Sequence, residues 1–113
     1  MDYLHTPAAD QLFRTLMTLQ SVDECYALFE DLCTVKELKD MSLRLEVARL
    51  LSQGVRYQDV MQQTGISTAT ISRVNRCLQY GAGGYRLAIS RMNQQDAETA
   101  GSHGAAEGDD GGR

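Results

Sequence analysis

Apolar residues recur every three or four positions along most of the chain, the spacing that places them on one face of an α-helix. Helix-start signals divide this pattern into segments. Thr6 with Pro7 is typical of an N-cap followed by the first helical residue, and Ser21 and Thr34 each stand three residues before a glutamate, as in a capping box. The predicted helices are residues 7–19, 22–33, 35–53, 57–63, 68–79 and 85–92. The predicted fold class is therefore all-α, with about six helices.

The third predicted helix is the longest, and it is apolar on two sides. A surface helix needs an apolar stripe only about 100° wide, so we expect a second copy of the chain to cover the other side. Asp40 and Arg44 fall inside the apolar arc, one turn apart. They can form an ion pair with each other, or Arg44 can reach a ligand. The apolar positions are Leu38, Met41, Leu43, Leu45, Val47, Ala48, Leu50 and Leu51.

Residues 55–80 predict a helix-turn-helix. A short helix is followed by Gly65, which permits a tight turn, and by Ser67, which is a good N-cap for the next helix. In that second helix Ile71 and Val74 fall on the inner face, whereas the outer face is polar. An amphipathic helix after a tight turn is the element that such motifs place on DNA.

The chain of 113 residues predicts a single domain over residues 1–92. Residues 7–53 would form the dimerisation helices, residues 55–80 the helix-turn-helix and residues 84–92 a short C-terminal helix. Residues 93–113 contain much Gly, Ala and acid with almost no large apolar side chain, and we expect them to be disordered.

Charge is segregated along the sequence. The net charge is −4, but residues 55–91 carry five arginines and one acidic residue and are therefore at +4, while residues 1–54 and residues 92–113 are each at −4. The one basic segment coincides with the predicted helix-turn-helix. This local footprint favours a polyanionic partner in spite of the acidic total.

The second helix of the motif begins with short polar side chains, which allow close approach to the floor of the major groove. Hydroxyl groups can bond bases or phosphates, a methyl group can contact thymine, and arginine can bind guanine or phosphate. The partner predicted is double-stranded DNA with a palindromic site. The candidate DNA-binding residues are Arg56, Ser67, Thr68, Ala69, Thr70, Ser72, Arg73 and Arg76.

The stretch LRLEVARLLSQGVRYQDVMQQTGISTATISRVNRCLQYG resembles the Trp repressor superfamily, and within it the YerC/YecD group of Trp-repressor-like proteins. The resemblance covers about residues 9–92, and its "ATISR" element is fairly specific. It implies two chains intertwined through their N-terminal helices, and DNA contacts from the turn and the first turns of the recognition helix. On this chain those contacts fall on Ser67, Thr68, Ala69, Thr70 and Ser72, with Arg56 and Arg76 added here for phosphates.

The resemblance also implies an effector pocket between two arginines, which correspond to Arg44 and Arg73. The repressor has a glycine after its second arginine, where indole enters, and a serine three positions beyond that glycine. This chain has Val74 and Cys77 there. We therefore do not expect tryptophan as corepressor, and any other small-molecule effector is left open.

The sequence offers little support for an enzyme or a metal protein. An enzyme needs convergent acid, base or nucleophilic groups, and neither His5 nor His103 lies in a predicted core helix. No spacing of Cys and His predicts a metal site, so the three cysteines are expected to be small buried hydrophobes. With no apolar segment long enough for a membrane span or a signal peptide, we expect a cytoplasmic protein.

The function predicted is that of a sequence-specific DNA-binding regulator, most simply a repressor. The alternative is a helical protein-interaction module of the transcription machinery.

Overall fold

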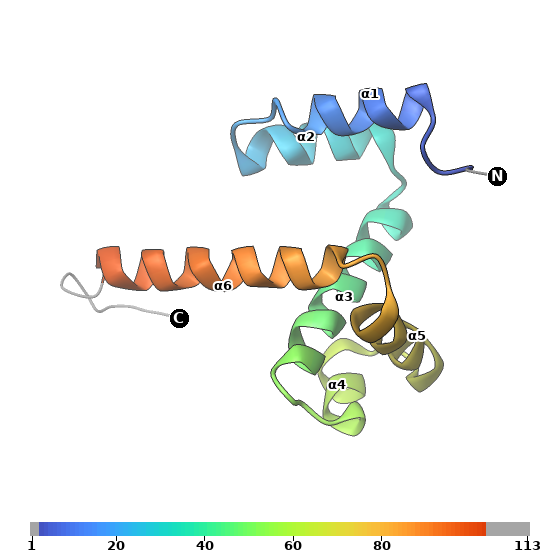
Figure 1. The fold of residues 1–113 in the computed structure, drawn as a ribbon, viewed down its shortest axis with the longest axis vertical. Coiled ribbons are helices and arrows are strands. Elements are labelled where there is room, and N and C mark those ends of the chain that lie inside the picture. The colour runs from blue at the N-terminus through green and yellow to red at the C-terminus, as the bar shows by residue number, and fades with distance from the viewer. Residues whose placement is uncertain (1–2, 104–113) are drawn as a thin grey trace. The chain divides into compact units, whose positions relative to one another are not determined.

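A computed structural model describes residues 3–103, and these residues form helices with no strand (Figure 1). The all-α prediction is confirmed. The chain divides into two compact units, residues 1–40 and 41–113, so that α3 begins in the first and ends in the second. The helices are α1 (Pro7–Leu16), α2 (Val22–Leu32), α3 (Val35–Ser52), α4 (Tyr57–Thr64), α5 (Thr68–Tyr80) and α6 (Gly84–His103).

The predicted N-caps of the first helices are confirmed. The Thr6 hydroxyl accepts a hydrogen bond of 3.0 Å from Ala9 N–H, and Pro7 is the first residue of α1. At the start of α3, Glu37 N–H donates to the Thr34 hydroxyl at 3.0 Å and Thr34 N–H donates to the Glu37 carboxylate at 2.8 Å. The backbone hydrogen bond from Thr34 lowers the pKa of Glu37, because it stabilises the ionised carboxylate.

The first unit has no interior of its own. None of the side chains described in residues 3–40 is buried. Large apolar side chains are instead open to solvent, among them Phe13 of α1 at 57% exposure, Met17 at the C-cap of α1 at 85% and Tyr26 of α2 at 57%. Cys25 is exposed and Cys33 is only half-buried. The prediction that the cysteines are buried hydrophobes is therefore wrong for the single chain, in which Cys77 is exposed as well.

The second unit contains a continuous apolar core. It is built from the end of α3, the inner faces of α4 and α5, and the beginning of α6. Val47, Val60 and Ile71 are completely buried in it. Three residues of α5 contribute, which fixes the face that α5 turns inward. The core residues are Val47, Ala48, Leu50, Val60, Ile71, Val74, Leu78 and Ile89.

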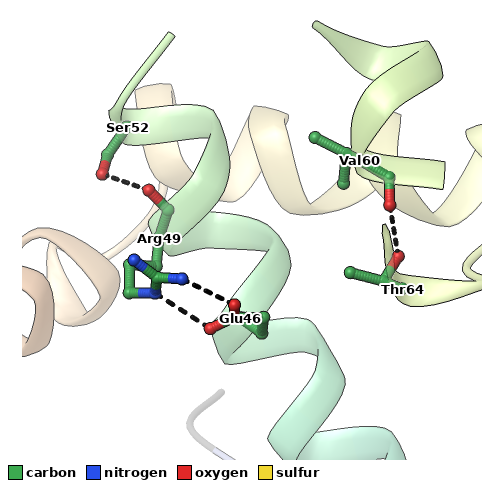
Figure 2. Close-up of polar contacts among 5 residues, drawn as sticks. All are labelled: Glu46, Arg49, Ser52, Val60 and Thr64. Atoms are coloured by element: carbon green, nitrogen blue, oxygen red, sulfur yellow. Dashed lines mark hydrogen bonds and ion pairs between the residues drawn. The ribbon is translucent and has the colours of Figure 1, made fainter. Parts of the chain in front are cut away.

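A two-point ion pair lies on the polar side of α3 (Figure 2). Arg49 donates from Nε and Nη2 to the two carboxylate oxygens of Glu46, at 2.9 and 2.7 Å. The hydrogen bonds from Arg49 lower the pKa of Glu46, and those same bonds raise the pKa of Arg49, with a smaller contribution from the charge of Asp96 on α6. On the same helix, Asp40 forms an ion pair of 2.9 Å with Lys36, one turn earlier in α3.

The last helix is much longer than the sequence pattern indicates. The predicted helix ends near residue 92, whereas α6 continues to His103. The expectation of disorder is therefore wrong for residues 93–103. This segment has no apolar periodicity to indicate a helix, and only five of its eleven residues are the strong helix formers Gln, Ala and Glu. The remainder of the predicted tail, residues 104–113, lies outside the described residues.

Candidate nucleic-acid interface

Helices α4 and α5 are joined by a turn of three residues that depends on one glycine. Gly65 has a φ of +73°, in the left-handed region, and its N–H donates a hydrogen bond of 2.8 Å to the carbonyl of Met61. This is a left-handed C-cap of α4. A residue with a Cβ is strained in this conformation, so the glycine predicted for the turn is required by backbone geometry.

Thr64 holds the same turn from its other side. Its hydroxyl donates to the carbonyl of Val60 at 2.7 Å, a bond drawn in Figure 2, and accepts a bond of 3.2 Å from Ile66 N–H. The side chain thus links the last turn of α4 to the segment that leads into α5. Thr64 is not among the residues that the sequence predicts for this site. A hydroxyl residue directly before the turn glycine was the available signal, because such residues bond nearby backbone groups.

Ser67 is the N-cap of α5, as predicted. Its Oγ accepts a hydrogen bond of 3.3 Å from Thr70 N–H and lies 3.3 Å from the Thr70 hydroxyl. Thr70 is half-buried at the edge of the helix. One hydroxyl therefore stabilises the start of α5, while the N–H groups of the first turn that have no helical acceptor face outward.

The remaining candidate residues of α5 share one side of the helix. Ile71, Val74 and Leu78 point into the core, and the opposite side is open to solvent. The stripe begins at Ala69, continues three and four residues later with Ser72 and Arg73, and ends at Arg76. Residues three or four apart lie next to one another on a helix, so these side chains form one continuous stripe. The exposed candidate residues are Thr68, Ala69, Ser72, Arg73 and Arg76.

The arginines of this region differ in their surroundings. Neither Arg73 nor Arg76 makes an ion pair with any residue between 3 and 103. Arg56 is the N-cap residue of α4 and forms an ion pair of 3.5 Å with Asp59, with 79% of its side chain exposed. The two guanidinium groups on the stripe of α5 therefore carry positive charge that is available to bind an anionic ligand.

The four residues assigned to an effector pocket do not share one environment. Val74 is part of the apolar core and is only 3% exposed. Arg73 and Cys77 are exposed on α5, and Arg44 is half-buried on α3. The branched side chain of Val74 therefore occupies packed space, where a glycine would leave room for part of a ligand.

Neither a metal centre nor a membrane span is found in the part of the chain that the structure describes. No group of three or more His, Cys, Asp or Glu side chains within residues 3–103 could hold a metal ion. No helix in the same range is both long and apolar enough to cross a bilayer.

Known proteins share the sequence and the helical fold of this chain. A family model described as "Trp repressor protein" matches residues 8–93. The chain is 44% identical over 100 residues to YerC of Bacillus subtilis (strain 168), an uncharacterized protein, and the match covers 88% of this chain and 96% of YerC.

Two solved structures have the same fold. A TrpR-like protein from Eubacterium eligens ATCC 27750 superposes with a TM-score of 0.77 at 47% identity, covering 80% of this chain and 93% of the other. A proposed Trp repressor from Staphylococcus aureus superposes with a TM-score of 0.76 at 48% identity, covering 80% of this chain and 90% of the other. The matching family is one of DNA-binding transcription regulators and not of enzymes.

Proposed function

The chain belongs to the Trp repressor family, and from this membership and the exposed face of α5 we propose that it is a sequence-specific DNA-binding repressor of transcription that acts as a homodimer. The observation that carries the proposal is the division of α5 into two sides. One side is committed to the core through Ile71, Val74 and Leu78, and the other presents short side chains followed by unpaired arginines.

In the proposed complex, α5 enters the major groove by its N-terminal end. The small side chains of Thr68, Ala69 and Ser72 let the helix approach the base edges, and their hydroxyl and methyl groups can read them. Arg73 and Arg76 lie farther along the stripe, where a guanidinium can bind guanine or a phosphate. The free N–H groups of the first turn add a site for a phosphate.

The homodimer is proposed because the N-terminal unit cannot be stable with its apolar faces in water. No described side chain of residues 3–40 is buried, and Met41 on α3 is still 38% exposed. A helical unit whose apolar side chains are at most half-buried has little to offset the loss of chain entropy on folding. A second copy whose α1 and α2 intertwine with these helices would bury both sets of apolar side chains and bring two α5 helices to one palindromic site.

We also propose that tryptophan is not the effector. The proposal is supported by the burial of Val74 in the core, since indole would need the space that this side chain fills. The protein would then bind its DNA without a corepressor or respond to a ligand of different shape. As a regulator of DNA, it would work in the cytoplasm, beside the chromosome.

A selection from genomic fragments by the purified protein tests the proposed function. We expect a roughly palindromic site, with half-sites about one helical turn of DNA apart. Affinity for that site should fall steeply as salt rises, because bound arginines displace counterions from the phosphates. The alternative, a protein-interaction module, predicts weak DNA binding without sequence preference, and binding to its own partner that salt hardly changes.

Variants sharpen the same test. Ser72→Ala should weaken the selected site by more than it weakens an unrelated duplex, because it removes a group that faces the bases. Arg76→Gln should weaken both and lower the slope of log affinity against log salt by about 0.9, the value for one phosphate contact. Arg14→Gln, which removes an exposed charge on α1 outside the basic segment, is the control and should change neither.

A further inference from the structure

The C-terminal end of α5 has carbonyl groups that its own helix cannot satisfy. The last helical hydrogen bond is the one from Gly81 N–H to the Cys77 carbonyl, at 2.8 Å. The next two carbonyls, those of Leu78 and Gln79, would be left without a helical donor, as at any helix end. A Cβ at Gly81 would overlap the Cys77 carbonyl oxygen, so this residue must be glycine for the last bond to form.

Arg86 on the first turn of α6 supplies the missing donors. Its Nε–H bonds the carbonyl of Leu78 at 2.8 Å, and its Nη2 bonds the carbonyl of Gln79 at 3.1 Å. Bonds from a charged donor are stronger than neutral ones, and a cation at a helix C-terminus also interacts favourably with the helix dipole. Because the guanidinium is planar and rigid, two bonds to successive carbonyls fix a direction as well as a distance.

The connection between α5 and α6 gives little other restraint. Residues 81–83 are Gly, Ala and Gly, so they offer almost no side chain to pack, and Gly83 has a φ of +91°. The other link is the apolar core, which contains Leu78 at the end of α5 and Ile89 of α6, with Tyr85 and Met92 of α6 packed against it. Apolar packing is not directional. The guanidinium bridge is therefore the directional contact that ties the end of α5 to α6.

We infer that Arg86 is a positioning residue for DNA recognition. By bonding the carbonyls of Leu78 and Gln79, it sets the orientation of α5, and with it the direction in which the exposed stripe of α5 faces. The inference rests on the proposed function. It separates Arg86 from Arg73 and Arg76 although all belong to the same basic segment, because the guanidinium of Arg86 is already bonded within the protein. Arg86 thus acts on base recognition through α5, without contacting the DNA.

The test compares wild type with Arg86→Gln and Arg86→Lys, and with Arg91→Gln as a charge-matched control on an exposed position of α6. Affinity is measured for the selected site and for an unrelated duplex of equal length, over a range of salt and well below the melting temperature. Arg86→Gln should lower affinity for the selected site about tenfold, the scale of one lost base contact, and leave the unrelated duplex unchanged within about twofold. The salt slope should stay that of wild type. Arg86→Lys keeps the charge but loses the two-point geometry, so it should also lose discrimination.

Two results would overturn the inference. A fall in both affinities together with a loss of about 0.9 in salt slope would make Arg86 a phosphate contact. An unchanged ratio of the two affinities with a lower melting temperature would make its role purely structural, because partial unfolding lowers both affinities equally.

The bridge can also be observed without DNA. In the free wild type, the Arg86 Nε–H should exchange slowly with solvent in a ¹⁵N NMR spectrum, and the Arg91 Nε–H should not. A wild type that shows this protection but selects no DNA contradicts the proposed function and with it the reading role of Arg86. A wild type that selects a site but has an unprotected Arg86 Nε–H overturns this inference alone.

Discussion

The Thr64 hydroxyl donates a hydrogen bond of 2.7 Å to the carbonyl of Val60, a residue that is completely buried. Through this bond the end of α4 is fixed to the core at the point where the chain turns toward α5. The same oxygen accepts from Ile66 N–H, in the turn itself. The geometry of the helix-turn-helix therefore depends on one partly buried side chain that bonds in both directions.

Thr64→Val should destabilise the protein by about 1 to 2 kcal/mol, because it leaves the N–H of Ile66 without its acceptor in a partly buried place. Thr64→Ser keeps the hydroxyl and is the matched control, with a smaller loss for the missing methyl group. Urea unfolding at one fixed protein concentration measures both. Equal stability of wild type and Thr64→Val would mean that Ile66 N–H finds another acceptor.

Gly65→Ala should cost about 1 kcal/mol in unfolding free energy, since a residue with a Cβ is strained at a φ of +73°. An added Cβ would meet no atom within 4 Å, so the cost is one of backbone conformation and not of collision. Gly65→Asn should lose less, because asparagine tolerates the left-handed region better. If Gly65→Ala and Gly65→Asn lowered the unfolding free energy equally, the loss would not come from the strain of a positive φ.

Contacts between near neighbours could be predicted from the sequence. The caps at Thr6, Thr34 and Ser67 involve residues three apart, so the residue types alone indicate the bond. The inward face of α5 was predicted in the same way from helical spacing. Each of these features depends on local chemistry that any helix start or amphipathic helix of this composition would share.

Features that depend on distant contacts or on weak local preference were missed. Arg86 bonds carbonyls seven and eight residues before it, across a loop whose path the sequence does not specify. The length of α6 was underestimated because residues 93–103 form a helix without an apolar stripe to reveal it. Cys25 was expected to be buried, but it is exposed in the single chain.

Acid should weaken the fold in part through Glu46. The hydrogen bonds from Arg49 hold the pKa of Glu46 below its ordinary value of 4.5, so the folded state favours the ionised form. This contribution to stability is present above the ordinary pKa and is lost as the pH falls through the folded pKa. Unfolding free energy measured from about pH 6 to about pH 3 should therefore fall more steeply for wild type than for Glu46→Gln.

The difference between the two curves should be less than about 1 kcal/mol and should shrink with added salt, because Glu46 is 41% exposed and the pair is screened. The lowered pKa of Glu37 leaves a common acid-dependent loss in both proteins. Parallel curves for wild type and Glu46→Gln would show that the ion pair with Arg49 does not persist in solution.

Tryptophan should not stabilise the protein. A ligand present at about 100 times its Kd raises unfolding free energy by about 2.7 kcal/mol, and we expect no rise in melting temperature with tryptophan because Val74 fills the space that indole would need. Val74→Ala should lower stability by about 2 kcal/mol, as a truncated core side chain does. A rise in the melting temperature of wild type with tryptophan would show that the core around Val74 opens to admit it.

Phe13→Ser should break the proposed dimer. Phe13 is 57% exposed in the single chain, and phenylalanine and serine have similar helix propensities, so in a monomer the change would cost no more than about 0.5 kcal/mol. In the dimer the ring would be covered by the partner, and its loss should weaken association by about tenfold or more, as truncation of a buried aromatic anchor does. Sedimentation across a range of concentrations measures the dissociation constant. Gln11→Ala, an exposed position on the same helix, is the control and should leave the constant unchanged. A wild type that sediments as a monomer at every concentration, or a Phe13→Ser protein that remains as dimeric as wild type, would contradict dimerisation through this face.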